Sequence, residues 1–484
     1  MNEQVFEYVL TVRQRTVQAR WQYPDADGNK VDGETAEQAI NADSLRMRTI
    51  GVLQSWLSRW GVLSRLQDTY AGLPVPNTSK VLGEHLYGLV FTDAVANAFD
   101  VVFAAAQARK ETLRVVLSFE LLGTQGADEI AGYPWEFLYR PGPDGFFIAA
   151  QTKFVLSREV MGRGRRTMAE DPPPLRVWFL VLTPEFEGFE EEHKELVMTF
   201  GEIEDFSGAL RPRAILRWDE EKIRKELKET KNPPHIIHVV AVCRSAANGS
   251  GGTFEIAFQN DQGRAVWQDQ DTLVGLLESA IQDTWTPRLV VLHLCETTAV
   301  DYLATFGHLA PKLIRAQFPA VLAMQYPLPA TEAKRFTSSF YKLLAEGRPI
   351  GDAVQGAREE FHQVGDANRL FGAPVLYLQA DDGRLVRTGN AGPSVPPRHD
   401  APAAPRGREG LIDALFRTAY VGAPAQEIGE RLSAQVRAQE WPENVDLWDG
   451  VIRLWWFAEP DLQKVQDVYR KMLELVARES GGRP

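Results

Sequence analysis

Two apolar runs decide the fold of this chain: IIHVVAVCR at 236–244 and RLVVLHLCETT at 288–298. Both are rich in β-branched and aliphatic residues without regular polar alternation, which is typical of strands buried on both faces. The two cysteines of the chain, Cys243 and Cys295, lie at the ends of these runs. Parallel sheets place ligand-binding and catalytic groups at the carboxyl ends of their strands, so both cysteines fall where chemistry is expected.

The same pattern continues on either side of these runs, over residues 173–385. Apolar strands such as LRVWFLVL and APVLYLQA alternate with amphipathic helices such as EEKIRKELKE and DTLVGLLESAI, and TFEIAF and AVWQD form a hairpin around NDQG. A further helix is expected near residues 192–210. This alternation predicts an α/β core in which a mostly parallel sheet is sandwiched by helices.

The chain before this core is expected to be α+β. Residues 1–110 are predicted to be a mainly helical region that opens with a strand at Val5–Val12 and continues with helices at Leu45–Trp60 and Val81–Gln107. Residues 111–172 contain strand-like runs and a PGPDG turn, which predict a β-hairpin region joined to the core. The charged, proline-bearing stretch GRGRRTMAEDPPP at 162–174 is an exposed boundary between these parts.

The chain after the core divides into a linker and a tail. Residues 386–408 are rich in Pro and Ala and are expected to be extended, and residues 409–484 are expected to form a small all-α C-terminal domain. That domain holds four of the chain's 12 tryptophans. They form either its core or an exposed stripe that binds a partner, such as a sensor protein.

Composition limits the functions open to the protein. The 484 residues carry a net charge of -12, so nucleic acid is not expected as a direct partner. Two cysteines are too few for a disulfide framework or a zinc site, and no P-loop or HExxH motif occurs, so no cofactor or metal is predicted. The absence of a secretory signal or a long apolar run predicts a cytoplasmic protein without a membrane span.

Several motifs in order resemble the CHAT family, which comprises bacterial relatives of caspases and separase, cysteine peptidases of clan CD. The two cysteine-bearing strands are the first, and AGYPWEFLYRP at 131–141 is similar to the family's proline-tryptophan-glutamate hallmark. FPAVLAMQYPLP at 318–329 resembles its next core strand, and FTSSFYKLLAEGRPIGDAVQGARE at 336–359 resembles its helix pair. The resemblance covers roughly residues 80–380 and implies a caspase-like fold.

The resemblance implies a catalytic dyad with one member missing. Cys295 stands at the position of the family's nucleophile, but aligning His238 with the family's earlier strand histidine puts Val242 at the catalytic base and Cys243 at the following glycine. A thiol needs a nearby imidazole to deprotonate it and to protonate the leaving amine. Backbone amides near Cys295 and Cys243 would form the oxyanion site, and Glu296 could cap a following helix whose dipole lowers the pKa of the thiol.

Three other histidines are candidates for the missing role. His238 lies four residues before Val242, His293 shares the strand of Cys295, and His308 follows on the next helix. Each could instead be a hydrogen-bonded structural histidine. Cys295 itself is either a reactive thiol or a small buried apolar residue, and a redox pair with Cys243 is a further alternative.

Two functions therefore remain open. The first is a caspase-like cysteine endopeptidase or effector acting on a protein substrate, which family resemblance associates with bacterial defence or regulated signalling. The alternative is a catalytically inactive pseudo-protease that uses the same fold as a protein-interaction scaffold.

Overall fold

The computed structural model of the protein describes residues 6–25, 27–58, 78–120, 130–168, 170–182, 209–216, 219–245, 254–260, 262, 264–282, 285–296, 302–325, 330–362, 370–381 and 383–386. The chain divides into two compact units, Met1–Gly389 and Asn390–Pro484. The tryptophan-rich tail lies outside the described residues, as do almost all of the predicted linker and of the helix expected near 192–210.

One large sheet organises the first unit. Within the described residues it contains fourteen strands, in the order β10-β9-β11-β14-β15-β16-β8-β5-β1-β2-β3, with β12 and β13 attached through β11 and β4 attached to β2. Their bounds are β1 (Phe6–Val12), β2 (Thr16–Pro24), β3 (Lys30–Glu34), β4 (Gln38–Ala39), β5 (Leu113–Phe119), β8 (Phe154–Val160), β9 (Leu175–Val181), β10 (Leu210–Leu216), β11 (Ile236–Ser245), β12 (Phe254–Gln259), β13 (Ala265–Asp269), β14 (Leu289–Glu296), β15 (Ala320–Met324) and β16 (Pro374–Leu378).

The sheet consists of two parallel blocks that run in opposite directions. β10, β9, β11, β14 and β15 are mutually parallel, and so are β16, β8, β5 and β1. The blocks meet where β15 pairs antiparallel with β16. We call them the core block and the N-terminal block, and their carboxyl ends lie at opposite edges of the sheet.

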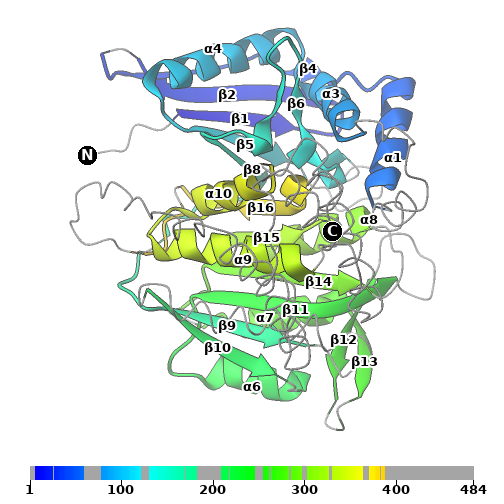
Figure 1. Cartoon of the computed structure of the whole chain (residues 1–484), viewed down its shortest axis with the longest axis vertical. Coiled ribbons are helices and arrows are strands. Elements are labelled where there is room, and N and C mark those ends of the chain that lie inside the picture. Colours follow the sequence, from blue (N-terminus) through cyan, green and yellow to red (C-terminus); the bar gives the residue numbers. More distant parts are fainter. Residues whose placement is uncertain are drawn as a thin grey trace, which may run out of the picture. The chain divides into compact units, whose positions relative to one another are not determined.

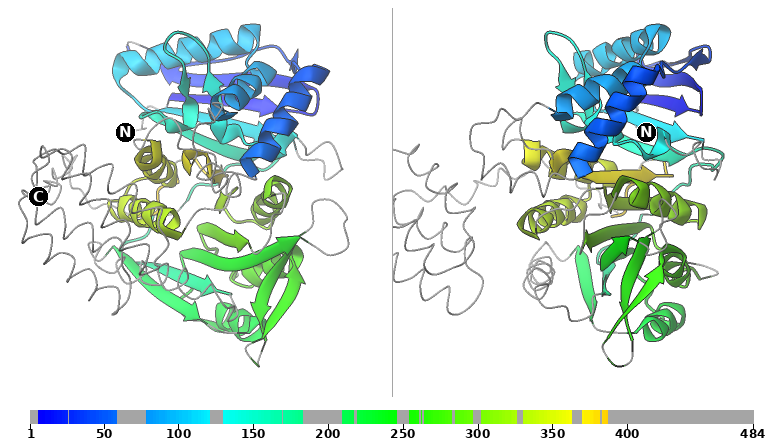
Figure 2. Two further views of the ribbon diagram at one scale, coloured as in Figure 1. Left: turned by 45° about the vertical axis from the view of Figure 1, so that its right-hand side comes forward. Right: turned by 90° about the vertical axis from the view of Figure 1, so that its right-hand side faces the viewer.

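Helices cover both faces of the core block, as the sequence predicts (Figure 1). One buried cluster joins the sheet to α1 (Ser44–Ser58), α3 (Thr78–Val90), α4 (Asp93–Arg109), α9 (Ala330–Ala345) and α10 (Ile350–His362). A second cluster joins its other face to α6 (Glu220–Glu229), α7 (Gln270–Glu278) and α8 (Tyr302–Arg315), and the two views of Figure 2 separate these layers. The α/β class with a mostly parallel sheet is therefore confirmed.

The N-terminal region contains more strands than the sequence predicts. The predicted first strand is present as β1, but β2, β3 and β4 follow it before any helix begins. The single helix expected at Val81–Gln107 is two helices, α3 and α4, because Thr92 adopts an extended conformation between them. No described helix alone is long and apolar enough to cross a membrane; α3 and α4 pass that test only as a pair, with a 110° bend between them.

The region predicted as a β-hairpin is only partly one. The PGPDG turn does join two short antiparallel strands, β6 (Tyr139–Arg140) and β7 (Phe146–Phe147). The longer strands β5 and β8, however, pair with each other in parallel inside the large sheet. Sequence cannot distinguish the two arrangements here, because both strands are buried runs without a turn directly between them.

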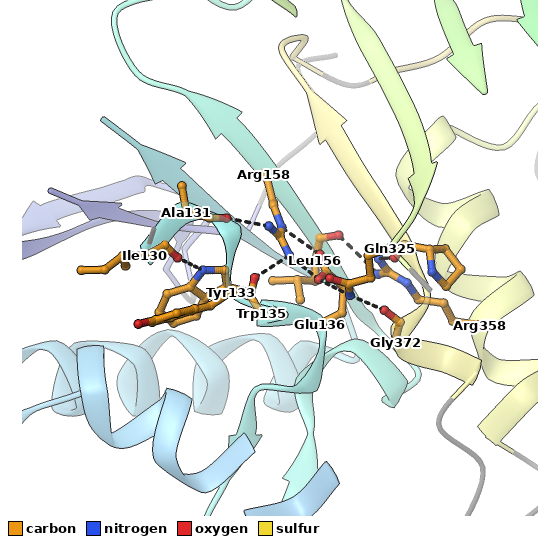
Figure 3. Close-up of polar contacts among 11 residues, drawn as sticks. Ile130, Ala131, Tyr133, Trp135, Glu136, Leu156, Arg158, Gln325, Arg358 and Gly372 are labelled. Carbon is orange, nitrogen blue, oxygen red and sulfur yellow. Dashed lines mark hydrogen bonds and ion pairs between the residues drawn. The ribbon is translucent and has the colours of Figure 1, made fainter. Parts of the chain in front are cut away.

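A buried ion pair lies where the two blocks meet (Figure 3). The Arg158 guanidinium on β8 donates from Nε to Glu136 Oε1 at 2.9 Å and pairs from Nη2 with the other carboxylate oxygen. It also donates to the carbonyl oxygens of Ala131, at 2.9 Å, and Tyr133, at 3.0 Å. Glu136 is the glutamate of the proline-tryptophan-glutamate hallmark. Arg158 therefore hydrogen-bonds to the backbone of that segment and also pairs with the charge of its glutamate.

Two further side chains extend this network into the core block and α10. Gln325, directly after β15, donates from Nε2 to Glu136 Oε2 at 2.9 Å and to the carbonyl of Gly372. Arg358 on α10 donates to the carbonyl of Pro374 at 2.6 Å. Burial lowers the pKa of Arg358 to about 10, and the charge of Arg158 adds to that lowering. For Arg158 burial also lowers the pKa, but the charge interactions and hydrogen bonds with Glu136 and Tyr377 together outweigh it, so the pKa lies above its usual value.

This network should dominate the response of stability to single substitutions. Removing one partner of a buried ion pair leaves an uncompensated charge, so Glu136→Gln should lower the free energy of unfolding by about 3–5 kcal/mol. The half-exposed pair of Arg140 with Asp100, at 3.0 Å, supplies the matched control, and Asp100→Asn should cost at most about 1 kcal/mol. Urea unfolding of the three proteins checks this, and equal losses for both variants would contradict it.

Candidate active site

The register of two neighbouring strands puts the positions of the implied dyad side by side. β11 and β14 pair in parallel, and Val242 is the direct ladder partner of Cys295. Neighbouring strands lie about 4.8 Å apart, so a side chain at 242 is the nearest cross-strand neighbour of position 295. The alignment that placed Val242 at the base is thus consistent with the geometry of the sheet.

Val242 is fully buried and sits within regular strand. β11 does not end there but continues to Ser245, because its last three residues pair antiparallel with β12. Cys243 pairs with Glu296 on one side and with Ile256 on the other. The segment predicted to contribute oxyanion donors is therefore held inside a three-stranded ladder.

The two cysteines occupy different positions of the pleat. The Cys243 side chain is buried in the cluster that includes Ala241 and Leu292. Position 295 belongs to the alternate set with Val291 and His293, which points to the opposite face in a regular strand. Glu296 is the last residue of β14, whereas α8 begins at Tyr302, so the Glu296 cap and the redox pair remain predictions.

His238 is placed away from the dyad positions and has a partner of its own. Its backbone pairs with Val291, four residues before Val242 on the same strand, which corresponds to roughly 13 Å. Its Nδ1 forms a 3.1 Å hydrogen bond with the Tyr341 hydroxyl on α9. The ring also contacts Phe179, with centroids 5.2 Å apart, so the imidazole is part of a buried aromatic cluster.

His293 lies between His238 and position 295 on the same face of the sheet. It pairs with Val240, is buried, and stacks against His238 with ring centroids 6.4 Å apart. Two residues along a strand separate it from Cys295, which corresponds to roughly 6.6 Å. His308 lies on α8, and its side chain falls outside the described residues, as do those of Cys295 and Glu296.

Burial favours the neutral form of His238. Burial holds the pKa of His238 well below its usual range, and the charge of His293 lowers it further. Tyr341, which sequence reasoning did not single out, is fully buried, and burial raises its pKa well above the usual value. The described residues contain no group of three or more His, Cys, Asp or Glu side chains that could hold a metal ion.

A cysteine position at the carboxyl end of a central parallel strand, beside the strand that should supply its base, is the layout of caspase-like cysteine proteases. The CHAT domain family matches residues 83–381, more than half of the chain, and the chain belongs to that family. The hallmark glutamate Glu136 and the cysteine position Cys295 both lie within the matched part.

Comparison with individual proteins adds little beyond the family. No curated protein matches the chain. Two crystal structures of the Saccharomyces cerevisiae separase–securin complex, at 2.6 and 3.0 Å, are similar to 60% and 61% of it, at 12% and 14% sequence identity and TM-scores of 0.29 and 0.30. The chain spans only 18% of the length of each of those matched chains.

The buried histidine should make stability depend on pH with a definite sign. Because the pKa of His238 is lower in the folded state, its protonation favours unfolding, so the free energy of unfolding is fully present above about pH 6.5 and falls as the pH drops below it. His238→Gln, which can still form a hydrogen bond with Tyr341, should reduce this fall, measured by urea unfolding at pH 7.5 and 5.

A second histidine and a control refine the measurement. Burial and then Arg176 lower the pKa of His235 to about 4, so part of the acid loss should persist in the variant. His85→Gln on α3 should leave the wild-type loss unchanged. If His238→Gln loses as much stability on acidification as the wild type, the neutral buried state assigned to His238 is wrong.

Proposed function

We propose that this protein is a CHAT-family pseudo-protease, which binds a partner protein through the caspase-like fold without hydrolysing peptide bonds. The observation that carries the proposal is that fully buried Val242 is the ladder partner of Cys295 at the position of the family's catalytic base. A valine can neither take the proton of a thiol nor return one to a leaving amine.

The nearby histidines are poorly arranged as substitutes. His238 is some four residues back along β11 and is hydrogen-bonded to Tyr341. His293 is on the same strand as Cys295, so its ring and the thiol would project side by side rather than toward each other. Their common burial with Phe179 supports a role in packing the sheet against α9.

The end of the sheet at which Cys295 lies is suited to binding a partner protein. The carboxyl ends of β11 and β14 form a rigid edge in the core block, and sites of α/β proteins are found at such edges. Under this proposal a protein partner occupies that edge, and the C-terminal helical domain engages a sensor. The setting that the family suggests is a cytoplasmic pathway of bacterial defence or regulated signalling.

A second candidate, a cysteine endopeptidase, is favoured by one observation. Cys295 itself is kept, and His293 precedes it by two residues on the same strand. An active enzyme would attack the substrate carbonyl with the Cys295 thiolate and form a thioester, after a partner or signal has moved a base into reach.

Installing the missing base tests the proposal. Val242→His should put an imidazole beside the thiol, stabilise the thiolate, and raise the rate of Cys295 alkylation by iodoacetamide at pH 6.5 by about tenfold or more. The wild type should label slowly. Peptide mass spectrometry of Cys295 gives the rate, and far-ultraviolet circular dichroism verifies the fold.

Two controls separate the effect of the base from loosened packing. Val242→Gln introduces a polar side chain without a base and should label like the wild type, and Cys295→Ala removes the signal. Fast wild-type labelling that Val242→His does not increase would favour the endopeptidase. Equal acceleration by Val242→Gln would show that packing rather than a proton acceptor controls the thiol.

A further inference from the structure

One exposed segment connects the two blocks of the sheet along the chain. Residues 161–174, which we call the strap, run from the end of β8 to the start of β9. The strap also follows the residues after β16, because Arg166 bridges to Ala380 and Asp171 bridges to Val386. It is therefore tied at several points rather than free along its length.

The carboxyl-terminal part of the strap is firmly anchored. The Arg166 backbone N–H donates to the Gln379 carbonyl at 2.9 Å, and its guanidinium donates to the Gln317 carbonyl at 3.1 Å. The Asp171 carboxylate lies 3.1 Å from His235 Nε2 and pairs with Arg288. This anchor lies at the amino ends of the core strands, at the edge opposite to Cys295.

Arg165 fixes the strap to the N-terminal block. Its guanidinium contacts Glu7 on β1 at 2.6 Å and pairs with Glu159 on β8. Both glutamates are buried. Burial raises the pKa of Glu159, and the charge of Arg165 opposes that rise. Withdrawing Arg165 would leave two buried carboxylates without their cation, so this side chain is held in place.

Arg163 differs from the other two arginines of the strap. It is exposed, and its guanidinium makes no hydrogen bond or ion pair in the described part of the chain, although its carbonyl accepts from Gln379 at 2.6 Å. Gly162, with φ of +81°, and Gly164 flank it, and a Cβ added at either glycine would meet no atom within 4 Å. An arginine between two glycines can move locally more readily than one held by side-chain contacts.

We propose that the Arg163–Gly164 bond is a processing site for an arginine-specific endopeptidase, which converts the protein into a two-chain form. Such an enzyme must draw the arginine side chain into an acidic pocket, and only Arg163 is available for this among the three. Water adds across the amide: the Arg163 carbonyl carbon gains the oxygen and becomes a carboxylate, and the Gly164 nitrogen leaves as an amine.

The contacts on either side of the bond should hold the two chains together after the cut. β8 stays paired with β16 across the cut, and Arg158 of the first chain stays in the network that Glu136 forms with Gln325 of the second. Arg165 would then bind Glu7 and Glu159 from the new chain. The product is a nicked, folded protein in which the strands from β1 to β8 belong to one chain and those from β9 to β16 to the other.

Limited proteolysis tests this directly. The full-length protein is treated briefly with an endoproteinase specific for arginine, and the cuts are placed by intact mass spectrometry. Cleavage after Arg163 should be faster than after Arg165 or Arg166 by roughly tenfold or more, because cleavage follows the population of the open segment. The two chains should co-elute in size-exclusion chromatography.

Matched variants decide between local exposure and general flexibility of the strap. Arg163→Gln should remove the fast cut, whereas Arg166→Gln should leave it unchanged. Glu7→Gln combined with Glu159→Gln should release Arg165 and add a cut after that residue. Rapid cleavage of Arg163→Gln after Arg165 or Arg166, or separation of the two chains on the column, would overturn the proposal.

Discussion

The buried pair of Glu136 with Arg158 is the constraint on which the rest of the structure depends. Within the N-terminal block, a single registered pair, Tyr377 with Arg158, joins β16 to β8. Backbone pairing is therefore sparse between β8 and the strand that meets the core block. The network supplies what the ladder lacks, because Glu136 binds Arg158 of one block and Gln325 of the other. Burying these charges carries a large desolvation cost, so we interpret the network as specifying how the blocks align rather than as a source of net stability.

Under the pseudo-protease proposal, this separation of the two sites explains how the fold could persist without a catalytic base at position 242. Glu136 and Arg158 hold the junction at β8 and β15, whereas the dyad positions lie on β11 and β14. Val242 contributes a buried apolar side chain to a central strand. A histidine there would need a hydrogen-bond partner, because burying an unpaired polar side chain costs free energy. Under the proposal, a valine in place of the base would remove the chemistry without weakening the contacts that set the fold. The His238–Tyr341 bond fastens α9 to the same sheet.

The sequence predicted the strands of the core, but not the contacts between residues that are far apart along the chain. The runs containing Cys243 and Cys295 predicted a parallel pair, because unbroken apolar strands between helices have few alternatives. The hallmark glutamate was recognised as a motif, yet its partner Arg158 was not, although a charged residue in the apolar strand FVLSREV was a visible signal. Partners more than twenty residues apart, such as Glu136 and Gln325, follow from tertiary packing and not from local pattern. The parallel pairing of β5 with β8 was missed for the same reason.

The central claim is that Cys295 stands in a caspase-like site without a base. The most direct test is the pH dependence of Cys295 alkylation in the wild-type protein, followed by peptide mass spectrometry from pH 5 to 9, with Cys295→Ala as the blank. The account predicts an apparent pKa at or above the roughly 8.5 of an unperturbed thiol, since no imidazole occupies position 242. An apparent pKa near 7 or below would contradict it, because it would show that another group stabilises the thiolate in a way that Val242 cannot.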